Sequence, residues 1–480
     1  MNYFISDLDK TLIFSGHPEC KNVEKYQGRE ITFMTKKSYE LFHKLLKVAM
    51  FIPCTMRSLS QTTRIDFVRE YNPKYMICTN GAEIFINGEL DKNWDNEMKK
   101  LVSKEEILDL QEKVDNLNLD LVENRNVNDF YIALKFKTTH LDKELELLRE
   151  IVPECYNIQQ DGIKVFLLNK LIDKSNAIIY LIEKENLKGT YFVAGDSNAD
   201  KKMCNLTFTK NYIPKHATFE SSNAYKTKQE KIFATEEILE QILLECYKNQ
   251  ITYIAELDQD VDDFVAVKYL HNKDVLNCIV LDPIPSSKEG KERVKELKDL
   301  GIIVKNSLPP TTKIVFCGGA LTTLSQYLRT HKIDLLVMNG GFVGSNIIPL
   351  NEQLKKFKNK ETIRTFNFNL DVEATHKILT TKNIQQIILV GKNVCHSSKN
   401  TLDGIWNNYK DIFEDISPTK RQHDMLACHE GLAYLGIESH FCNFEKVRPY
   451  NEGLKGNMTL WGSTKENSPY NEVLSAISYI

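Results

Sequence analysis

The stretch Tyr3-Phe4-Ile5-Ser6-Asp7-Leu8-Asp9-Lys10-Thr11 decides the fold, because a short apolar strand there ends in acidic residues. The stretch Ile251-Thr252-Tyr253-Ile254-Ala255-Glu256-Leu257-Asp258-Gln259-Asp260-Val261-Asp262-Asp263 repeats the same plan. The chain therefore begins twice, each time with a strand whose carboxyl end carries a cluster of carboxylates and is followed by an amphipathic segment. Ligands bind outside the carboxyl ends of the strands in an open parallel sheet, so both clusters are candidate sites.

Strand-like runs alternate with helical patterns along both halves, which is typical of α/β sheets. The clearest runs are 191–194, 313–316, 335–338 and 387–390, and a helical pattern covers 291–300. We predict an α/β fold with two Rossmann-like parallel-sheet domains, residues 1–249 and 250–480. A closing amphipathic helix over 235–250 precedes the boundary.

An insertion interrupts the first domain over about residues 84–165. A Lys/Glu-rich helical segment at 103–117 is followed there by strand-like pieces such as 130–136. This mixture predicts a small α+β cap.

Composition limits the function classes. The chain has 480 residues, a formal net charge of −3 and 42% hydrophobic residues. The balanced charge gives no support to nucleic acid or an anionic membrane as a partner, and no apolar run approaches a membrane span. We expect no signal peptide. The eleven scattered cysteines indicate reduced thiols and a cytoplasmic protein.

The pattern Asp7-x-Asp9-x-Thr11 places two carboxylates on one turn after a strand. Such a pair can share a divalent cation, with one carboxylate as nucleophile and the other as general acid/base. A solvated turn would have the same sequence, so the pattern alone leaves both readings open.

Three further segments of the sequence favour phosphate chemistry. Thr55, Arg57 and Ser58 offer hydroxyls and a cation for phosphate oxygens, and Lys174 supplies a cation before a helix. Asp196 and Asp200, in Gly195-Asp196-Ser197-Asn198-Ala199-Asp200, are hard oxygen ligands suited to Mg²⁺.

These segments occur in the order and approximate spacing of the haloacid dehalogenase superfamily. Residues 1–240 resemble its Cof-like branch with a C2-type cap, and Thr79-Asn80-Gly81-Ala82 resembles the turn before that cap. The resemblance implies that Asp7 is the phosphorylated nucleophile and a Mg²⁺ ligand, and that Asp9 is the acid/base and lies at the metal. It further implies phosphoryl binding by Thr55 and Lys174, substrate binding by Arg57 and Ser58, and Mg²⁺ binding by Asp196 and Asp200.

Four carboxylates crowd positions 258 to 263 in the second half, at Asp258, Asp260, Asp262 and Asp263. A cation or the solvent must offset their repulsion, so this cluster alone would also fit a solvated acidic turn. Four more segments accompany it: Cys317-Gly318-Gly319-Ala320-Leu321-Thr322, Met338-Asn339-Gly340-Gly341, Phe366-Asn367-Phe368-Asn369-Leu370-Asp371-Val372-Glu373-Ala374 and His423-Asp424-Met425-Leu426-Ala427.

This series resembles the nucleoside hydrolases. The resemblance implies Ca²⁺ bound by Asp258, Asp263, Asp424 and the Thr322 carbonyl, a ribose contacted by Asn367 and Asn369, and Asp262 as the base for the attacking water. It also implies that His423 lies beside the leaving base, where an imidazole can help to protonate it.

The second half departs from that family at several positions. Glu256 replaces its first Asp, Gln259 and Asp260 replace its Pro-Gly, and Thr365 replaces a Glu near the sugar's 5′ end. Losing that carboxylate would relieve repulsion toward a 5′-phosphate, so nucleotides stay open as substrates. A degenerate domain that only binds a nucleoside stays open as well.

The two halves together predict a bifunctional hydrolase of nucleotide metabolism that acts on a phosphorylated nucleoside or sugar, and a homo-oligomeric state stays open. The order of the two steps is open. The alternatives are a phosphatase whose second half is a non-catalytic nucleoside-binding or regulatory module, and a sugar phosphatase with an unrelated second domain.

Overall fold

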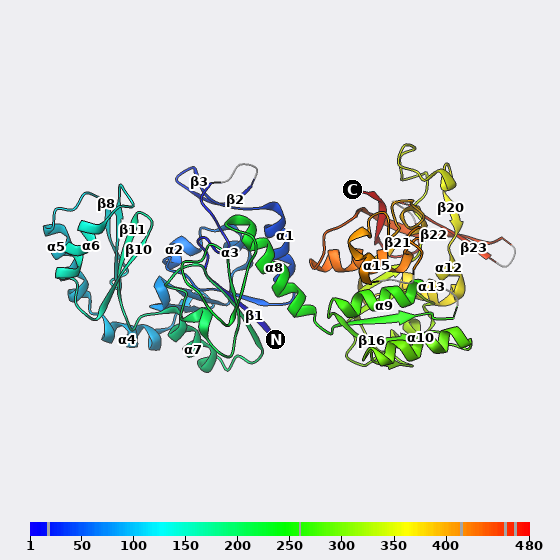
Figure 1. Ribbon diagram of the computed structural model, residues 1–480, viewed down its shortest axis with the longest axis horizontal. Helices are drawn as coiled ribbons and strands as arrows, with labels where there is room; N and C mark the ends of the chain where they lie inside the picture. The colour runs from blue at the N-terminus through cyan, green and yellow to red at the C-terminus, as the bar shows by residue number, and fades with distance from the viewer. Residues whose placement is uncertain (17–19, 259–260, 413–415, 456–457, 465–467) are drawn as a thin grey trace. The chain divides into compact units, whose positions relative to one another are not determined.

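The computed structural model describes residues 1–16, 20–258, 261–412, 416–455, 458–464 and 468–480. Its chain forms two compact units, Met1–Ile242 and Leu243–Ile480. Both are α/β, which confirms the predicted fold class (Figure 1). None of the described helices has the length and apolar character needed to cross a membrane.

The first unit is built on a five-stranded parallel sheet, in the order β14-β13-β12-β1-β4. Its strands are β1 (Asn2–Ser6), β4 (Met50–Pro53), β12 (Thr190–Ala194), β13 (Lys210–Ile213) and β14 (Ala224–Lys226). The helices of this core are α1 (Lys36–Leu45), α2 (Leu59–Thr62), α3 (Asp66–Tyr71), α7 (Lys174–Lys184) and α8 (Ile232–Tyr247).

Both faces of this sheet are covered, which explains why its strands are apolar almost without alternation. On one face, Phe51 of β4 packs against Phe42 of α1 and Phe67 of α3. On the other face, Val193 of β12 shares a core with Ile178 of α7. The carboxyl ends of β1, β4 and β12 consequently meet at one edge, where the predicted acids and phosphate-binding residues follow.

A hairpin of β2 (Lys21–Tyr26) and β3 (Arg29–Met34) follows the first strand. A second antiparallel group, β5 (Tyr75–Cys78), β6 (Glu83–Ile86) and β7 (Glu89–Leu90), precedes α4 (Lys92–Leu101). It leads into the cap.

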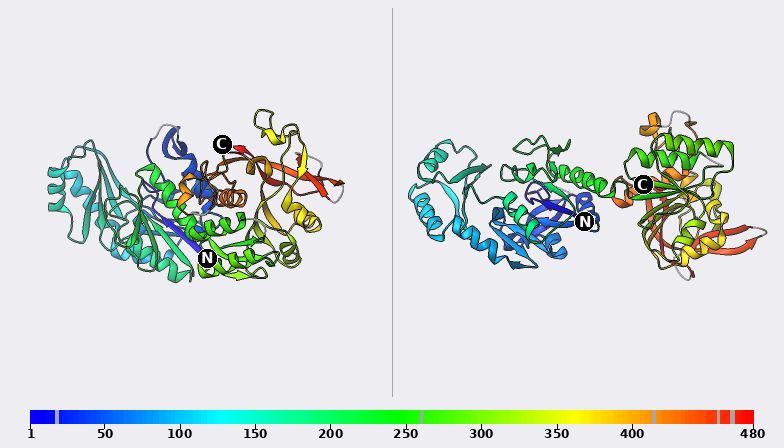
Figure 2. Two further views of the ribbon diagram at one scale, coloured as in Figure 1. Left: turned by 45° about the vertical axis from the view of Figure 1, so that its right-hand side comes forward. Right: turned by 90° about the horizontal axis from the view of Figure 1, so that it is seen from below.

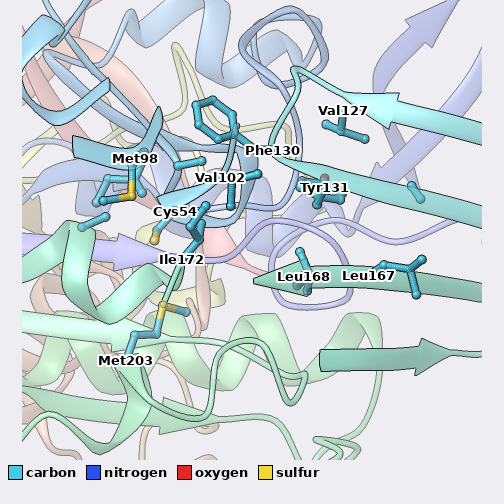
Figure 3. Close-up of a cluster of buried hydrophobic side chains, with 14 of the residues drawn as sticks. Cys54, Met98, Val102, Val127, Phe130, Tyr131, Leu167, Leu168, Ile172 and Met203 are labelled. Atoms are coloured by element: carbon cyan, nitrogen blue, oxygen red, sulfur yellow. The ribbon is translucent and has the colours of Figure 1, made fainter. Parts of the chain in front are cut away.

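The cap is a four-stranded antiparallel sheet, in the order β10-β11-β9-β8, with two helices. Its elements are α5 (Lys104–Asn116), β8 (Leu121–Val127), β9 (Tyr131–Phe136), α6 (Asp142–Ile151), β10 (Tyr156–Asp161) and β11 (Lys164–Asn169). The two helices lie on the same face of this sheet (Figure 2). Buried cap residues such as Tyr131 and Leu168 belong to the same hydrophobic cluster as Cys54 and Met203 of the core (Figure 3). The base of the cap is therefore packed against the carboxyl edge of the core sheet.

The second unit has a ten-stranded sheet, in the order β17-β16-β15-β18-β19-β21-β24-β22-β23-β20. Its parallel part consists of β15 (Ile251–Ala255), β16 (Leu276–Leu281), β17 (Val304–Lys305), β18 (Ile314–Cys317), β19 (Ile333–Asn339), β21 (Ile384–Val390) and β24 (Val473–Tyr479). An antiparallel end consists of β22 (Cys442–Lys455), β23 (Met458–Thr464) and β20 (Thr362–Arg364). The sheet is thus mixed, whereas the sequence predicted a parallel one.

Helices also cover both faces of the second sheet. One face carries α9 (Asp262–Asn272) and α15 (His423–Leu435), and the other carries α11 (Thr322–Tyr327), α12 (Phe366–Leu370) and α13 (Val372–Thr380). The remaining helices include α10 (Lys288–Asp299) and α14 (Lys392–Cys395). Asp258, Asp262 and Asp263 follow the parallel strand β15, just as Asp7 and Asp9 follow β1.

Candidate functional site

A cavity of about 390 Å³ lies in the first unit, between the carboxyl edge of the core sheet and the cap. Asp7, Asp9, Thr55, Arg57, Lys174 and Asp196 all line it. The structure thus brings together residues from three strand ends and one helix start, which are up to 189 positions apart in the sequence.

Asp7 and Asp200 share one buried lysine. Lys174 Nζ lies 2.6 Å from Asp7 Oδ1 and 2.6 Å from Asp200 Oδ1, and the lysine is only 1% exposed. Lys174 is the first residue of α7, so the start of that helix delivers its ammonium to the end of β1. A buried carboxylate is tolerated only when it is paired, and this lysine pairs two.

A third carboxylate joins this pair. Oxygen atoms of Asp7, Asp196 and Asp200 lie within 4.8 Å of one another, and no other such group of acidic, histidine or cysteine ligands occurs among the described residues. Burial raises the pKa of Asp7 to about 7, opposed by Lys174 and assisted by Asp200. Burial and the charges of Asp200 and Asp7 likewise raise the pKa of Asp196.

Three buried carboxylates with one lysine leave an uncompensated negative charge at this point. Hard oxygen ligands with that charge fit Mg²⁺, the ion that the sequence resemblance implies. The Thr11 hydroxyl donates to Asp196 at 3.1 Å, and the Ser197 amide and hydroxyl donate to Asp200 at 2.9 and 2.7 Å. These bonds orient the carboxylates toward the site.

Asp9 lies outside this carboxylate group. Its two oxygens accept from Arg57 Nε at 2.6 Å and from Arg57 Nη2 at 2.7 Å, and a third guanidinium nitrogen bonds to Glu24 at 2.9 Å. Burial favours the neutral form of Asp9, but these hydrogen bonds and the Arg57 charge lower its pKa overall. The guanidinium thus occupies both oxygens of Asp9, which do not converge with those of Asp7, Asp196 and Asp200, and metal binding by Asp9 stays a prediction.

Thr55 lines the cavity, and its hydroxyl accepts from the Arg57 amide at 3.2 Å. Ser58 takes a different role from the predicted one. It caps the short helix α2, where its amide N–H bonds to the Gln61 side chain, and it is not among the residues that line the cavity.

The cap supplies the opposite wall. Tyr131 and Phe166 form a T-shaped aromatic pair with ring centres 6.3 Å apart, and the other lining residues from the cap are Arg125, Gln159, Asp161 and Lys164. The sequence analysis missed this wall, and also Glu24, because nothing in a strand pattern shows which side chains of a cap face the core.

A second cavity, of about 460 Å³, lies within the second unit. Four acids line it, from the loop after β15 and from the first turns of α9 and α15: Glu256, Asp262, Asp263 and Asp424. Burial raises the pKa of Asp263, and the charges of Glu256 and Asp262 add to this rise.

Predicted catalytic and sugar-binding residues are found in this cavity. His423 Nδ1 lies 3.9 Å from Asp262 Oδ2, and Asn339 donates to Asp424 Oδ1 at 2.8 Å. Asn367 also lines the cavity, where its amide donates to the carbonyls of Gly318 and Asn339, both at 2.7 Å. These bonds fix the Asn367 amide plane.

The predicted calcium ligands do not gather. Asp258 accepts four hydrogen bonds from the amides and hydroxyls of Ser286 and Ser287, at 2.7 to 3.0 Å, and these lower its pKa to about 2. The Thr322 carbonyl accepts from the Ser325 hydroxyl at 2.9 Å, and neither Asp258 nor Thr322 lines the cavity. The donor set therefore does not fit Ca²⁺, because the start of α10 holds the first ligand.

Asn369 also lies away from the cavity lining. Its amide donates to Thr365 and Thr459, and its oxygen accepts from the Thr459 amide, so it joins α12 to β23. Gln259 and Asp260 lie outside the described residues.

Two lining residues of the second cavity, Lys392 and His396, escaped the sequence analysis. A signal existed, because Lys392 follows the apolar run 387–390 by two positions, just as the predicted acids follow theirs.

The sequence matches the family Sucrose-6F-phosphate phosphohydrolase over residues 2–246, slightly more than half of the chain. The chain belongs to this family. Its first unit is accordingly a phosphatase of the haloacid dehalogenase superfamily, as predicted. The match ends at residue 246, so the resemblance of the second half to nucleoside hydrolases stays a prediction.

Solved structures with similar folds include a sucrose-phosphatase from Synechocystis sp. PCC6803 in complex with sucrose and phosphate. This chain is 18% identical to it, with 50% of this chain and 96% of that one covered and a TM-score of 0.36. Proteins from Thermoplasma acidophilum and Thermotoga maritima are each 17% identical, with TM-scores of 0.38 and 0.35. They cover 51% and 50% of this chain, and 98% and 96% of their own. A search of curated proteins finds no match.

Proposed function

We propose that the first unit hydrolyses a phosphorylated sugar through a phosphoaspartate on Asp7. The observation that supports this most directly is the joint placement of Asp7, Lys174 and the Asp196–Asp200 pair at one strand edge. Mg²⁺ held by Asp7, Asp196 and Asp200 would offset the charge of the transferring phosphoryl group.

In the first step an oxygen of Asp7 attacks phosphorus, and the bond from phosphorus to the sugar oxygen breaks. Asp9 gives that oxygen a proton. In the second step Asp9 takes a proton from water, the water oxygen attacks phosphorus, and inorganic phosphate leaves Asp7 free. Lys174 and Thr55 hold the phosphoryl oxygens during both steps.

Arg57 pairs with Asp9 in the enzyme without substrate. A carboxylate that accepts two guanidinium bonds is held in its charged form, so it cannot donate a proton there. An incoming phosphate is a strong bidentate partner for arginine, and it would draw Arg57 away from Asp9. Substrate binding would thereby release the acid that the reaction needs.

A sugar fits the cap wall of the cavity. Tyr131 and Phe166 offer aromatic surface for the C–H face of a ring, and Gln159 can bond to hydroxyl groups. The test measures phosphate release from a panel of compounds. The panel contains sugar phosphates, including sucrose 6F-phosphate, and nucleoside monophosphates, and the rates rank them as substrates. Asp7→Asn should abolish release from every one, whereas Asp120→Asn, at an exposed cap position, should leave it unchanged. Phosphate release by Asp7→Asn above that of a buffer blank would contradict the nucleophile assignment.

For the second unit we propose a nucleoside-binding module. The Asn367 amide and the acids of the cavity can hold the hydroxyls of a ribose. Cleavage of the N-glycosidic bond stays a prediction, favoured by the proximity of Asp262 to His423. Free base measured by chromatography after incubation with nucleosides, with and without Ca²⁺, tests it, and Asp262→Asn should stop any release. A chain that binds nucleosides and releases no base would be a module only.

A further inference from the structure

Groups of opposite charge line the cavity of the second unit, where the four acids described above are joined by Lys392 and His396. The His396 ring lies 5.0 Å from the His423 ring, whose Nδ1 lies 3.9 Å from Asp262 Oδ2. A ligand that fills the cavity therefore meets both carboxylates and a cation.

Lys392 is half-buried and has no acidic partner among the residues that the structure describes. Its ammonium makes no ion pair and no hydrogen bond with the part of the chain that the structure describes. Burial lowers its pKa, and the positive charges of Lys356 and Arg364 lower it further. No carboxylate contributes to this shift, so the acids of the cavity do not compensate Lys392. An anion from a ligand would do so.

Two more features of the cavity lack partners. Thr365 is 1% exposed, and its hydroxyl has no hydrogen-bond partner among the residues described. Beside it, Phe366 and Leu370 are 44% and 38% exposed although both are large and apolar. They are four positions apart on α12, so they form one surface. Such a surface suits a flat ring, since the π-face of a base stacks on an aromatic side chain.

We propose that this cavity binds a nucleoside 5′-monophosphate, with its phosphate at Lys392 and Thr365, its ribose between Asn367 and the acids, and its base against Phe366 and Leu370. This inference rests on the proposed nucleoside-binding function and specifies its ligand class. The phosphate would compensate Lys392 and accept from the Thr365 hydroxyl, and the base would cover the exposed surface of Phe366 and Leu370. A plain nucleoside would leave Lys392 uncompensated, and a sugar phosphate would leave the apolar surface exposed.

Calorimetric titration of the full chain tests the proposal. The protein carries Asp7→Asn to prevent dephosphorylation, and EDTA removes divalent ions. The probes are adenosine, inosine, uridine and cytidine, their 5′-monophosphates, ribose 5-phosphate and inorganic phosphate. At least one monophosphate should bind about ten times more tightly than its nucleoside, because a charge-assisted contact to a phosphate is worth about 1.4 kcal/mol or more.

Two substitutions locate the contacts. Lys392→Gln should remove the tenfold preference for the monophosphate and leave nucleoside affinity unchanged, while Lys305→Gln, at the exposed far edge of the sheet on β17, should change neither. Phe366→Ala should weaken the nucleoside and the monophosphate by the same factor. Equal affinities in the parent, or a preference that survives Lys392→Gln, would overturn the phosphate assignment while leaving nucleoside binding intact. If no nucleoside and no monophosphate binds, both the module and this inference fail.

Discussion

Replacing Lys174 with methionine tests the electrostatic design of the phosphatase site. Lys174 holds two buried carboxylates at 2.6 Å each, and Lys174, Asp7 and Asp200 are almost completely buried. Methionine retains most of the side-chain volume but removes the charge. Asp7 and Asp200 then remain buried next to each other and next to Asp196.

Breaking a buried ion pair by removing one partner costs about 3–5 kcal/mol of the free energy of unfolding. For a unit of this size, 1 kcal/mol lowers the melting temperature by about 2–4 °C. We therefore expect the transition of the first unit to fall by about 6–20 °C in EDTA. Added Mg²⁺ should recover part of this loss, because the ion would supply the charge that Lys174 no longer provides.

Differential scanning calorimetry of the full chain measures the effect, and the transition that responds to Mg²⁺ identifies the first unit. Lys100→Met is the matched control, because Lys100 also forms a 2.6 Å ion pair, with Glu97, but both side chains are exposed. Exposed pairs contribute less than about 1 kcal/mol, so the control should shift by no more than about 4 °C. A shift for Lys174→Met as small as that of the control would refute the reasoning.

Three further predictions concern single contacts. Glu24→Gln should lower the stability of the first unit by about 1–3 kcal/mol in calorimetry, because the buried Glu24 carboxylate holds Arg57, whereas an unchanged transition would contradict this. Lys10→Ala removes the ion pair to Asp161 of the cap, so KM should rise about two- to fivefold with kcat nearly unchanged, and steady-state kinetics that show the reverse would count against it. The folded-state pKa of Asp258 is about 2, below its unfolded value, so its stabilising effect is present above about pH 4 and is lost as the pH falls toward 2. Urea unfolding should thus show a gap between the protein and Asp258→Asn at pH 5 that narrows by pH 2.5, and a constant gap would contradict the assignment.

The sequence was informative wherever a strand end carried the chemistry. Asp7, Thr55, Lys174 and Asp196 could be assigned to one edge because each follows a strand or begins a helix of an α/β pattern. The topology of the sheet alone determines which residues lie at that edge, so their placement can be predicted without knowing side-chain conformations.

Side-chain partners that are distant in sequence could not be predicted in the same way. Asp258 was expected at a metal, but Ser286 and Ser287 at the start of α10 compete for it with four hydrogen-bond donors. Carboxylates are favoured at helix starts, and nothing in the sequence between Asp258 and Ser286, 28 positions later, indicates that this start lies beside Asp258. Asp9 and Arg57, 48 positions apart, form their pair for a similar reason.

The two units begin with the same arrangement of a strand and acids but place their cations differently. In the first unit a buried lysine lies among the strand-end acids, and the residual charge of three converging carboxylates suits a divalent ion. In the second unit the first acid is drawn away to α10, and Lys392 lies apart from the remaining acids. The difference is the position of the cation: Lys174 pairs with two acids of the phosphatase site, whereas no carboxylate compensates Lys392 in the second cavity. A ligand with both hydroxyls and a phosphate matches the acids and the ammonium of that cavity, and such a ligand carries the kind of group that the first unit removes.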